Sequence, residues 1–113
     1  MHEMSLAESV LEIAEQAARE KGFRHVRAIR LEIGALAAVD PEAMRFCFAA
    51  VIRSSLAEGA RLELAVVPGR ARCLQCAKEV AVQAVYDLCP ECGSHRLEVT
   101  GGRQMRVTEM EVE

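Results

Sequence analysis

Two Cys-x-x-Cys pairs lie in the second half of this 113-residue sequence, at C73-L-Q-C76 and C89-P-E-C92. Pairs with this spacing are typical of two facing knuckles that supply four thiolates, here Cys73, Cys76, Cys89 and Cys92, to one tetrahedral metal ion. A segment of about 33 residues cannot hold itself together by apolar burial alone. We therefore expect the metal to supply folding free energy for residues 70–102, on the order of 10 kcal/mol or more.

The identity of the expected metal follows from the surroundings of the cysteines. The C-P-E-C-G knuckle at residues 89–93 resembles that of rubredoxin, which makes iron the rival of zinc. Rubredoxins, however, have a longer spacing and an aromatic-rich shell, whereas Tyr86 is the only aromatic residue in this segment. We therefore predict structural Zn²⁺ in a closed site, which leaves no open position for water or substrate.

The remaining sequence has the periodicities of helices and strands. Asp40 followed by Pro41 is a strong helix start, with a cap and a proline in the first turn. Ser5 and Glu8 have the spacing of a capping box, and Gly22 is a plausible helix end. The predicted elements are a helix over 5–21, a strand over 24–34 with a bulge near Ala28, a helix from Pro41 to Gly59, a strand over 61–67, short strands at 79–82 and 96–99, and a strand over 103–112.

These elements predict an α+β fold made of two parts. The last strand, residues 103–112, has no partner of matching length among the cysteines, so we expect it to return and pair with the strands of the first half. The result is a small three-stranded mixed sheet with two helices, formed by residues 1–69 and 103–113. Residues 70–102 are then an inserted, zinc-ribbon-like domain with four cysteine ligands.

Composition and charge exclude several classes of function. The net charge is −3, and the charged residues of the cysteine segment balance, so no basic face is available for nucleic acid. No apolar run is long enough for a membrane helix, and no basic-apolar leader precedes the first helix. We expect a cytoplasmic protein that binds neither nucleic acid nor membranes. No phosphate loop or nucleophile motif is present, so we predict no enzyme.

The first three residues, M-H-E, form a second candidate metal site. The α-amine of Met1, the amide nitrogen of His2 and the imidazole of His2 can close two chelate rings around one ion. A deprotonated amide suits square-planar Ni²⁺ or Cu²⁺ better than tetrahedral Zn²⁺. The fourth position is open to the Glu3 amide, the Glu3 carboxylate or a distant group.

Taken together, these features resemble the HypA/HybF hydrogenase nickel-incorporation proteins. The resemblance covers essentially the whole chain. It rests on the M1-H2-E3-M4-S5 start, I33-G34, V39-D40, the two cysteine knuckles and the closing E109-M110-E111-V112-E113. It implies a nickel metallochaperone for maturation of [NiFe]-hydrogenase, with some family members also serving urease. It further implies that Met1, His2 and Glu3 hold the transported Ni²⁺ and that the four cysteines hold Zn²⁺.

The resemblance also implies partners and raises questions about individual residues. The expected partners are a HypB-type GTPase and the [NiFe]-hydrogenase large subunit precursor, and a homodimer is left open. Asp40 matches a family position near the nickel end, but we expect it chiefly to cap the second helix. His95 is a loop residue, a hydrogen-bonding neighbour of the zinc ligands or a distant nickel ligand, in that order. The alternative function is a zinc-ribbon adaptor between proteins that uses no nickel.

Overall fold

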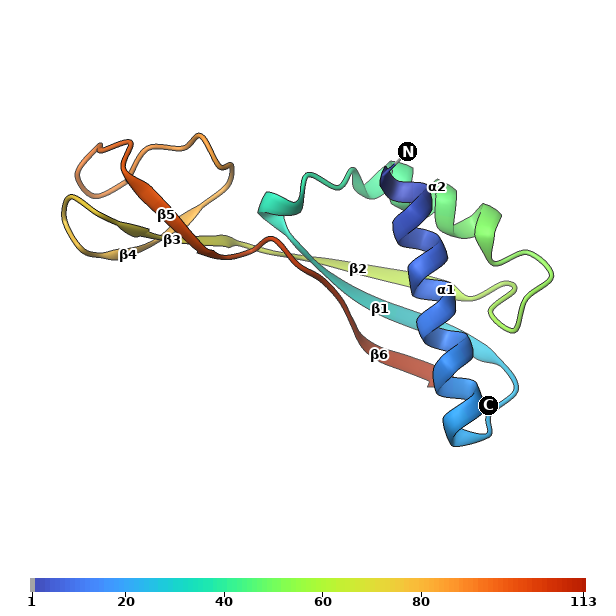
Figure 1. Cartoon of the computed structure of the whole chain (residues 1–113). Helices are drawn as coiled ribbons and strands as arrows, with labels where there is room; N and C mark the ends of the chain where they lie inside the picture. Colours follow the sequence, from blue (N-terminus) through green and yellow to red (C-terminus); the bar gives the residue numbers. More distant parts are fainter. Residues whose placement is uncertain (1) are drawn as a thin grey trace. The chain divides into compact units, whose positions relative to one another are not determined.

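The computed structural model describes residues 2–113, which fold into two compact units. The helix–sheet unit comprises the described residues up to Leu31 together with Val39–Ala65 and Val107–Glu113. The cysteine unit comprises Glu32–Ala38 and Val66–Arg106. Each unit has its own three-stranded sheet, as Figure 1 shows. The predicted α+β class, with two helices and a separate cysteine-bearing part, is confirmed.

Helix α1 spans His2–Lys21 and buries Ala7, Val10 and Ala14. It ends where the sequence predicts, because Gly22 adopts a left-handed φ of 80° and donates its N–H to Ala18 O at 2.8 Å. The predicted start at Ser5 is wrong, since the helix already begins at His2. The first turn is anchored by a tertiary contact, in which a Glu3 carboxylate oxygen accepts the backbone N–H of Asp40 at 3.1 Å.

Helix α2 spans Pro41–Val51 and begins as predicted. Asp40 caps it, with Oδ1 accepting the backbone N–H groups of Glu42 at 3.0 Å and Ala43 at 3.4 Å. The predicted end at Gly59 is wrong. The Ser55 hydroxyl donates to Ile52 O at 2.6 Å and accepts the Ala57 N–H at 3.0 Å, so turns replace the helical ladder after Val51.

The sheet of the helix–sheet unit has the order β2-β1-β6, with β1 Val26–Gly34 in the centre, β2 Arg61–Val67 on one side and β6 Met105–Val112 on the other. Strands β1 and β2 run in the same direction, connected through α2 (Figure 1). Strand β6 is antiparallel to β1, because His25 and Glu113 exchange both backbone hydrogen bonds. The predicted return of the last strand and the mixed sheet are both confirmed.

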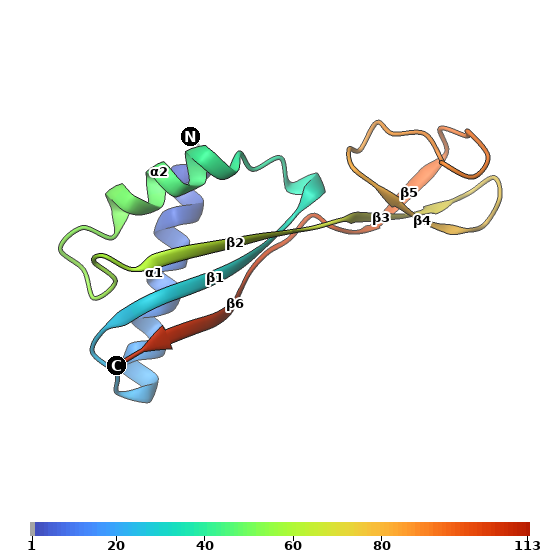
Figure 2. The same ribbon diagram turned by 180° about the vertical axis from the view of Figure 1, so that it is seen from behind.

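The core of the helix–sheet unit lies between this sheet and the helices. Helix α1 crosses one face of the sheet, in front in Figure 1 and behind in Figure 2, and packs against α2. Fully buried side chains come from both helices and the sheet: Val10 from α1, Ile29 and Leu31 from β1, and Met44 from α2. Ala28 and Ile29 are both buried, which confirms the change of phase expected at Ala28, whereas the bulge itself stays a prediction.

The sheet of the cysteine unit is antiparallel, in the order β4-β3-β5. Its strands are β3 Gly69–Cys73, β4 Glu79–Val82 and β5 Leu97–Gly101. Strand β4 matches the predicted range, whereas β5 begins one residue later and ends two residues later than predicted. The small core of this unit consists of Leu36 from the 3-10 turn Ala35–Ala37, together with Ala71, Cys73, Val80, Val82 and Cys89.

Candidate metal centre

The two Cys-x-x-Cys pairs bring four sulfur atoms together in the cysteine unit. The Sγ atoms of Cys73, Cys76, Cys89 and Cys92 all lie within 4.8 Å of one another. Two of the separations are 3.6 Å, between Cys73 and Cys92, and 3.8 Å, between Cys76 and Cys89. A regular tetrahedron with Zn–S bonds of about 2.3 Å has sulfur–sulfur edges of about 3.8 Å. The four side chains therefore fit a tetrahedral zinc ion.

Each pair is held in a tight turn built by its backbone. In the first, Cys73 O accepts the N–H of Ala77 at 2.9 Å, and Ala77 has a left-handed φ of 65°. In the second, Cys89 O accepts the N–H of Gly93 at 2.8 Å, and Gly93 has a φ of 78°. The two knuckles thus share one geometry. Sequence reasoning missed the roles of Ala77 and Gly93, although the glycine after Cys92 is a signal for a left-handed turn.

The knuckles come from different parts of the cysteine unit. Cys73 ends β3, and its N–H donates to Lys78 O at 2.9 Å, just before β4 begins. Cys89 lies in the long connection between β4 and β5, where its N–H donates to Ser94 O at 2.8 Å. Cys73 and Cys89 are buried, whereas Cys92 is exposed. The site therefore has an inner side, which is part of the core, and an outer side in contact with solvent.

Two of the four thiols have shifted pKa values, in opposite directions. The backbone N–H of Cys76, followed by that of Gln75, points at Cys73 Sγ from 3.4 Å and lowers the pKa of Cys73 to about 6. The N–H of Ser94 lowers the pKa of Cys92, but desolvation and the neighbouring thiols outweigh it and raise that pKa to about 12. Ionisation is therefore favoured at Cys73 and opposed at Cys92, and a bound cation would favour the ionised form of both.

The second candidate site, at the start of the chain, has a different character. The described part consists of His2 and Glu3, because Met1 lies outside the described residues. The His2 side chain is 55% exposed, and its Nδ1 lies 3.9 Å from a Glu3 carboxylate oxygen. The Glu3 side chain is only 14% exposed. The N–H of Asp40, which this carboxylate accepts, is the main cause that lowers the pKa of Glu3.

Asp40 connects this end of α1 with α2. Its side chain caps α2, as predicted, and its backbone N–H binds Glu3, so the first turns of the two helices are joined. Within residues 2–113, the four cysteines form the one group of three or more potential metal ligands, and neither His2 nor His95 belongs to such a group. Cys47, the fifth cysteine, is buried in α2.

Comparison with known proteins identifies the family. The family model for HypA, described as hydrogenase/urease nickel incorporation, metallochaperone, matches residues 1–112. This chain belongs to the HypA family. The chain is also similar to the hydrogenase maturation factors HypA of Azotobacter vinelandii, at 58% identity, and Dechloromonas aromatica (strain RCB), at 51% identity. Both matches extend over 113 residues and cover 100% of each chain.

Solved structures show that the HypA fold is also the fold found here. The solution structure of the nickel metallochaperone HypA from Helicobacter pylori matches with a TM-score of 0.71 at 23% identity, covering 97% of this chain and 96% of that one. A second HypA solution structure matches with a TM-score of 0.70 at 24% identity, covering 100% and 97%. The HypA family consists of metallochaperones and maturation factors, which confirms the prediction that the chain is not an enzyme. None of the described helices has the length and apolar character needed to cross a membrane.

Proposed function

We propose that this HypA protein binds Ni²⁺ at its N-terminus and delivers it, in the cytoplasm, to the precursor of a [NiFe]-hydrogenase large subunit. A HypB-type GTPase is the proposed partner in this transfer. The proposal divides the chain into a nickel-binding domain, residues 1–69 and 103–113, and a zinc-binding domain, residues 70–102. The observation that supports it best is the position of His2, which is exposed and opens helix α1.

The start of a helix suits nickel ligation through backbone amides. The first four N–H groups of an α-helix have no acceptor within the helix, so deprotonating the amide of His2 breaks no helical hydrogen bond. A deprotonated amide also carries negative charge, which offsets the unfavourable placement of a cation at the positive end of the helix dipole. The Met1 amine, the His2 amide and the His2 imidazole supply three ligands and leave one position for a further ligand.

The contacts of the Glu3 carboxylate argue against it as that fourth ligand. The carboxylate already accepts the Asp40 N–H and is largely buried, so turning it toward a metal would leave that N–H without its partner. The Glu3 amide is also unsuitable, because the Met1 amine, the His2 imidazole and the Glu3 amide cannot all lie beside the His2 amide in one square plane. The Glu3 side chain then has a structural role: its hydrogen bond with the Asp40 N–H holds the first turn of α1 beside α2. We therefore assign the nickel site to Met1, His2 and Glu3, with Met1 and His2 as ligands and the Glu3 side chain as the group that positions them.

The four cysteines are proposed to hold a structural Zn²⁺. Their donor set and spacing fit this ion, and two of them form part of the core of the cysteine unit. When bound, zinc supplies folding free energy and no open coordination position. Its role would be to keep the cysteine unit folded.

Equilibrium dialysis with Ni²⁺ tests the nickel site. His2→Gln should reduce nickel binding at least tenfold and leave the zinc content unchanged. His25→Gln is the matched control, since His25 is also exposed but lies just before β1, and it should bind nickel as the parent does. If His2→Gln retains the parent affinity, the nickel proposal is wrong and the zinc-ribbon adaptor becomes the better account.

The chain terminus provides a second test. A residue added before Met1 converts the amine to an amide and moves His2 out of chelate register. An N-terminal tag should thus abolish nickel binding, whereas a tag after Glu113 should not. Titration with Ni²⁺, followed by the d–d absorption of a square-planar nitrogen site, distinguishes the two forms. Equal affinities would show that the opening residues do not hold nickel.

A further inference from the structure

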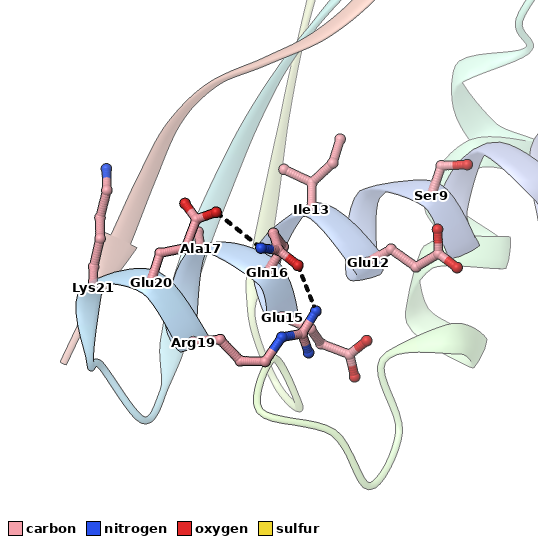
Figure 3. Close-up of a pocket in the computed structure, with 9 residues that line it drawn as sticks. All are labelled: Ser9, Glu12, Ile13, Glu15, Gln16, Ala17, Arg19, Glu20 and Lys21. Carbon is pink, nitrogen blue, oxygen red and sulfur yellow. Dashed lines mark hydrogen bonds between the residues drawn. The ribbon is translucent and has the colours of Figure 1, made fainter.

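A hollow of about 760 Å³ lies along helix α1, and Figure 3 draws the side chains that line it. Gln16 bridges Glu20 and Arg19 there through two hydrogen bonds of 2.8 Å, so these polar groups engage one another. The lining contains neither cysteine nor histidine. The most reactive side chains lie elsewhere, because four of the five cysteines meet in the cysteine unit.

The four cysteines of the candidate zinc site differ in how far solvent reaches them. Cys73 and Cys89 are buried, Cys76 is partly buried, and Cys92 is exposed. A dissolved oxidant therefore meets Cys92 before the other three. Oxidation of a cysteine follows its exposure and its thiolate character, and a sulfur that holds zinc does so as a thiolate. Cys92 meets both requirements when the site holds zinc.

The sulfur closest to Cys92 among the printed contacts of the site belongs to the other knuckle. Cys92 Sγ lies 3.6 Å from Cys73 Sγ. Cys89, which shares the C-P-E-C knuckle with Cys92, has its Sγ 3.8 Å from Cys76 Sγ. These two short contacts both run between the knuckles, whereas the Cys-x-x-Cys spacing by itself suggests a pair within one knuckle.

A bond between Cys73 and Cys92 would keep the parts of the cysteine unit connected. Cys73 ends β3 and belongs to the small core, whereas Cys92 lies in the connection between β4 and β5. The bond would join positions that are 19 residues apart, which restricts the unfolded chain and so favours the folded one. A bond within one knuckle would close a much shorter loop and would not connect these two parts.

We propose that the four-cysteine site is a reversible peroxide switch, in which Cys92 reacts first and Cys73 closes a disulfide with it. This inference rests on the zinc site of the proposed function and does not involve nickel. Two of the four sulfurs are consumed by the bond, so the oxidised chain no longer holds zinc. A dithiol reductant reopens the bond and restores the four ligands.

The oxidation takes place in two steps. In the first, the Cys92 thiolate attacks one oxygen of hydrogen peroxide, the O–O bond breaks, and the departing hydroxide takes up a proton to become water; Cys92 is left as the sulfenic acid. In the second, the Cys73 thiolate attacks the Cys92 sulfur, the S–O bond breaks, and a second hydroxide leaves and is protonated. Two thiolates, one peroxide and two protons thus give one disulfide and two waters, with two electrons passing from sulfur to oxygen.

Hydrogen peroxide added to the reduced, zinc-loaded full chain tests the switch. A chromophoric chelator follows the release of zinc, and peptide mapping under non-reducing conditions identifies the disulfide. Zinc should leave as the Cys73–Cys92 bond forms, and dithiothreitol with added zinc should restore the starting zinc content. A reduced chain that contains no zinc before peroxide is added would overturn the zinc site and the switch with it. A zinc-loaded chain that keeps its zinc in peroxide would overturn the switch alone.

The disulfide map and the reversal provide further ways to overturn the proposal. A Cys89–Cys92 or Cys73–Cys76 bond would show that oxidation stays within one knuckle. A dimer linked through Cys92 would show that the exposed sulfur reacts with a second copy before Cys73 reaches it. Zinc release that dithiothreitol does not reverse would show irreversible oxidation in place of a switch.

Two variants with the same donor set identify the sulfur that reacts first. Cys92→His replaces the exposed thiolate by an imidazole, which keeps a set of three cysteines and one histidine suited to zinc. Its zinc release in peroxide should be at least tenfold slower than that of the parent. Cys76→His is the matched control, because it keeps both Cys92 and Cys73, and its release rate should stay within threefold of the parent. Equal release rates in the two variants would contradict the role of Cys92, and the disulfide map of the parent decides the pairing even where a variant fails to bind zinc.

Discussion

The two units of this chain have cores of different composition. The helix–sheet unit buries aliphatic and sulfur-containing side chains from two helices and a sheet, with Val10, Ile29, Leu31 and Met44 completely inaccessible. In the cysteine unit, two of the six buried core residues, Cys73 and Cys89, are also candidate metal ligands. The first unit can therefore be stabilised by apolar burial, whereas the second needs a metal ion to complete its interior.

The strongest test of this difference is loss of the metal. Cys73→Ser removes a thiolate that is both ligand and core residue, so the cysteine unit should lose on the order of 10 kcal/mol and unfold. The helix–sheet unit should remain folded. Metal analysis and hydrogen exchange measure the two effects, and Cys47→Ala, a buried cysteine of the other unit, should retain the zinc. If the Cys73→Ser variant holds one zinc tightly and hydrogen exchange in β3 and β4 is unchanged, the cysteine unit does not depend on the four-cysteine metal site for its stability.

The reverse test weakens the apolar core. Ile29 lies in the central strand β1 with no exposed surface, so Ile29→Ala should destabilise the helix–sheet unit by about 2–5 kcal/mol. Zinc content should not change. Ile13→Ala is the control, because Ile13 is 45% exposed and its truncation should cost about 1 kcal/mol or less. Thermal unfolding followed by circular dichroism measures both variants, and equal losses would mean that Ile13 belongs to the core after all.

Local signals in the sequence were enough for most of the fold. Asp40-Pro41 predicted the start of α2, and alternation predicted β2 and β4 to the residue. The cysteine spacing predicted which four side chains would meet. The last strand has no partner among the cysteines, which correctly predicted its return to the first sheet, whereas its position at the edge of that sheet was not predicted.

The errors arose where tertiary contacts override local preference. The Glu3 contact with Asp40 joins residues 37 positions apart and extends α1 to His2, which a capping-box pattern at Ser5 could not indicate. Ile13 has the periodicity of a core residue but is 45% exposed, whereas the smaller Ala7 is buried. For the same reason the sequence left the role of Glu3 at the nickel site open, since only the structure shows what its carboxylate contacts.

A smaller effect is expected from the cap of α2. Asp40→Ala removes an acceptor for two backbone N–H groups and should destabilise the helix–sheet unit by about 1 kcal/mol. Asp40→Asn keeps a capping oxygen and should cost less. Because the cap belongs to the helix–sheet unit and the zinc ligands to the cysteine unit, neither variant should alter zinc retention during titration with a chelator. A zinc loss in Asp40→Ala would instead show that the two units unfold together.

The two knuckles allow a reciprocal test within the cysteine unit. Ala77 and Gly93 occupy the same left-handed position, but alanine is strained there. Ala77→Gly relieves this strain in the folded unit, but glycine also makes the unfolded chain more flexible, which opposes folding. The net effect should be a slight stabilisation of the zinc-loaded unit, by up to about 1 kcal/mol. Gly93→Ala should destabilise it by about 1 kcal/mol. Chelator titration measures both, and shifts of the same sign would contradict the shared geometry.

The smallest expected effect is the pH dependence that Glu3 gives to the helix–sheet unit. The Asp40 N–H lowers the pKa of Glu3 in the folded chain, so folding favours the ionised carboxylate. This stabilisation is complete above the ordinary glutamate pKa of about 4.3 and is lost as the pH falls through the lowered value. Glu3→Gln keeps an oxygen that can accept the same N–H but cannot ionise.

The melting temperature of the parent should therefore exceed that of Glu3→Gln at pH 7, and the difference should shrink toward zero as the pH falls below about 4. Melting is followed by a spectroscopic probe in α1 and without nickel, so that the release of metal ions in acid does not affect the measured melting temperature. Glu8→Gln is the control for the loss of a charge on α1, because Glu8 is exposed and lies five residues further along the helix. A Glu3→Gln difference that grows on acidification would mean that folding favours the protonated carboxyl, and the contact with Asp40 would not be what anchors the first turn of α1.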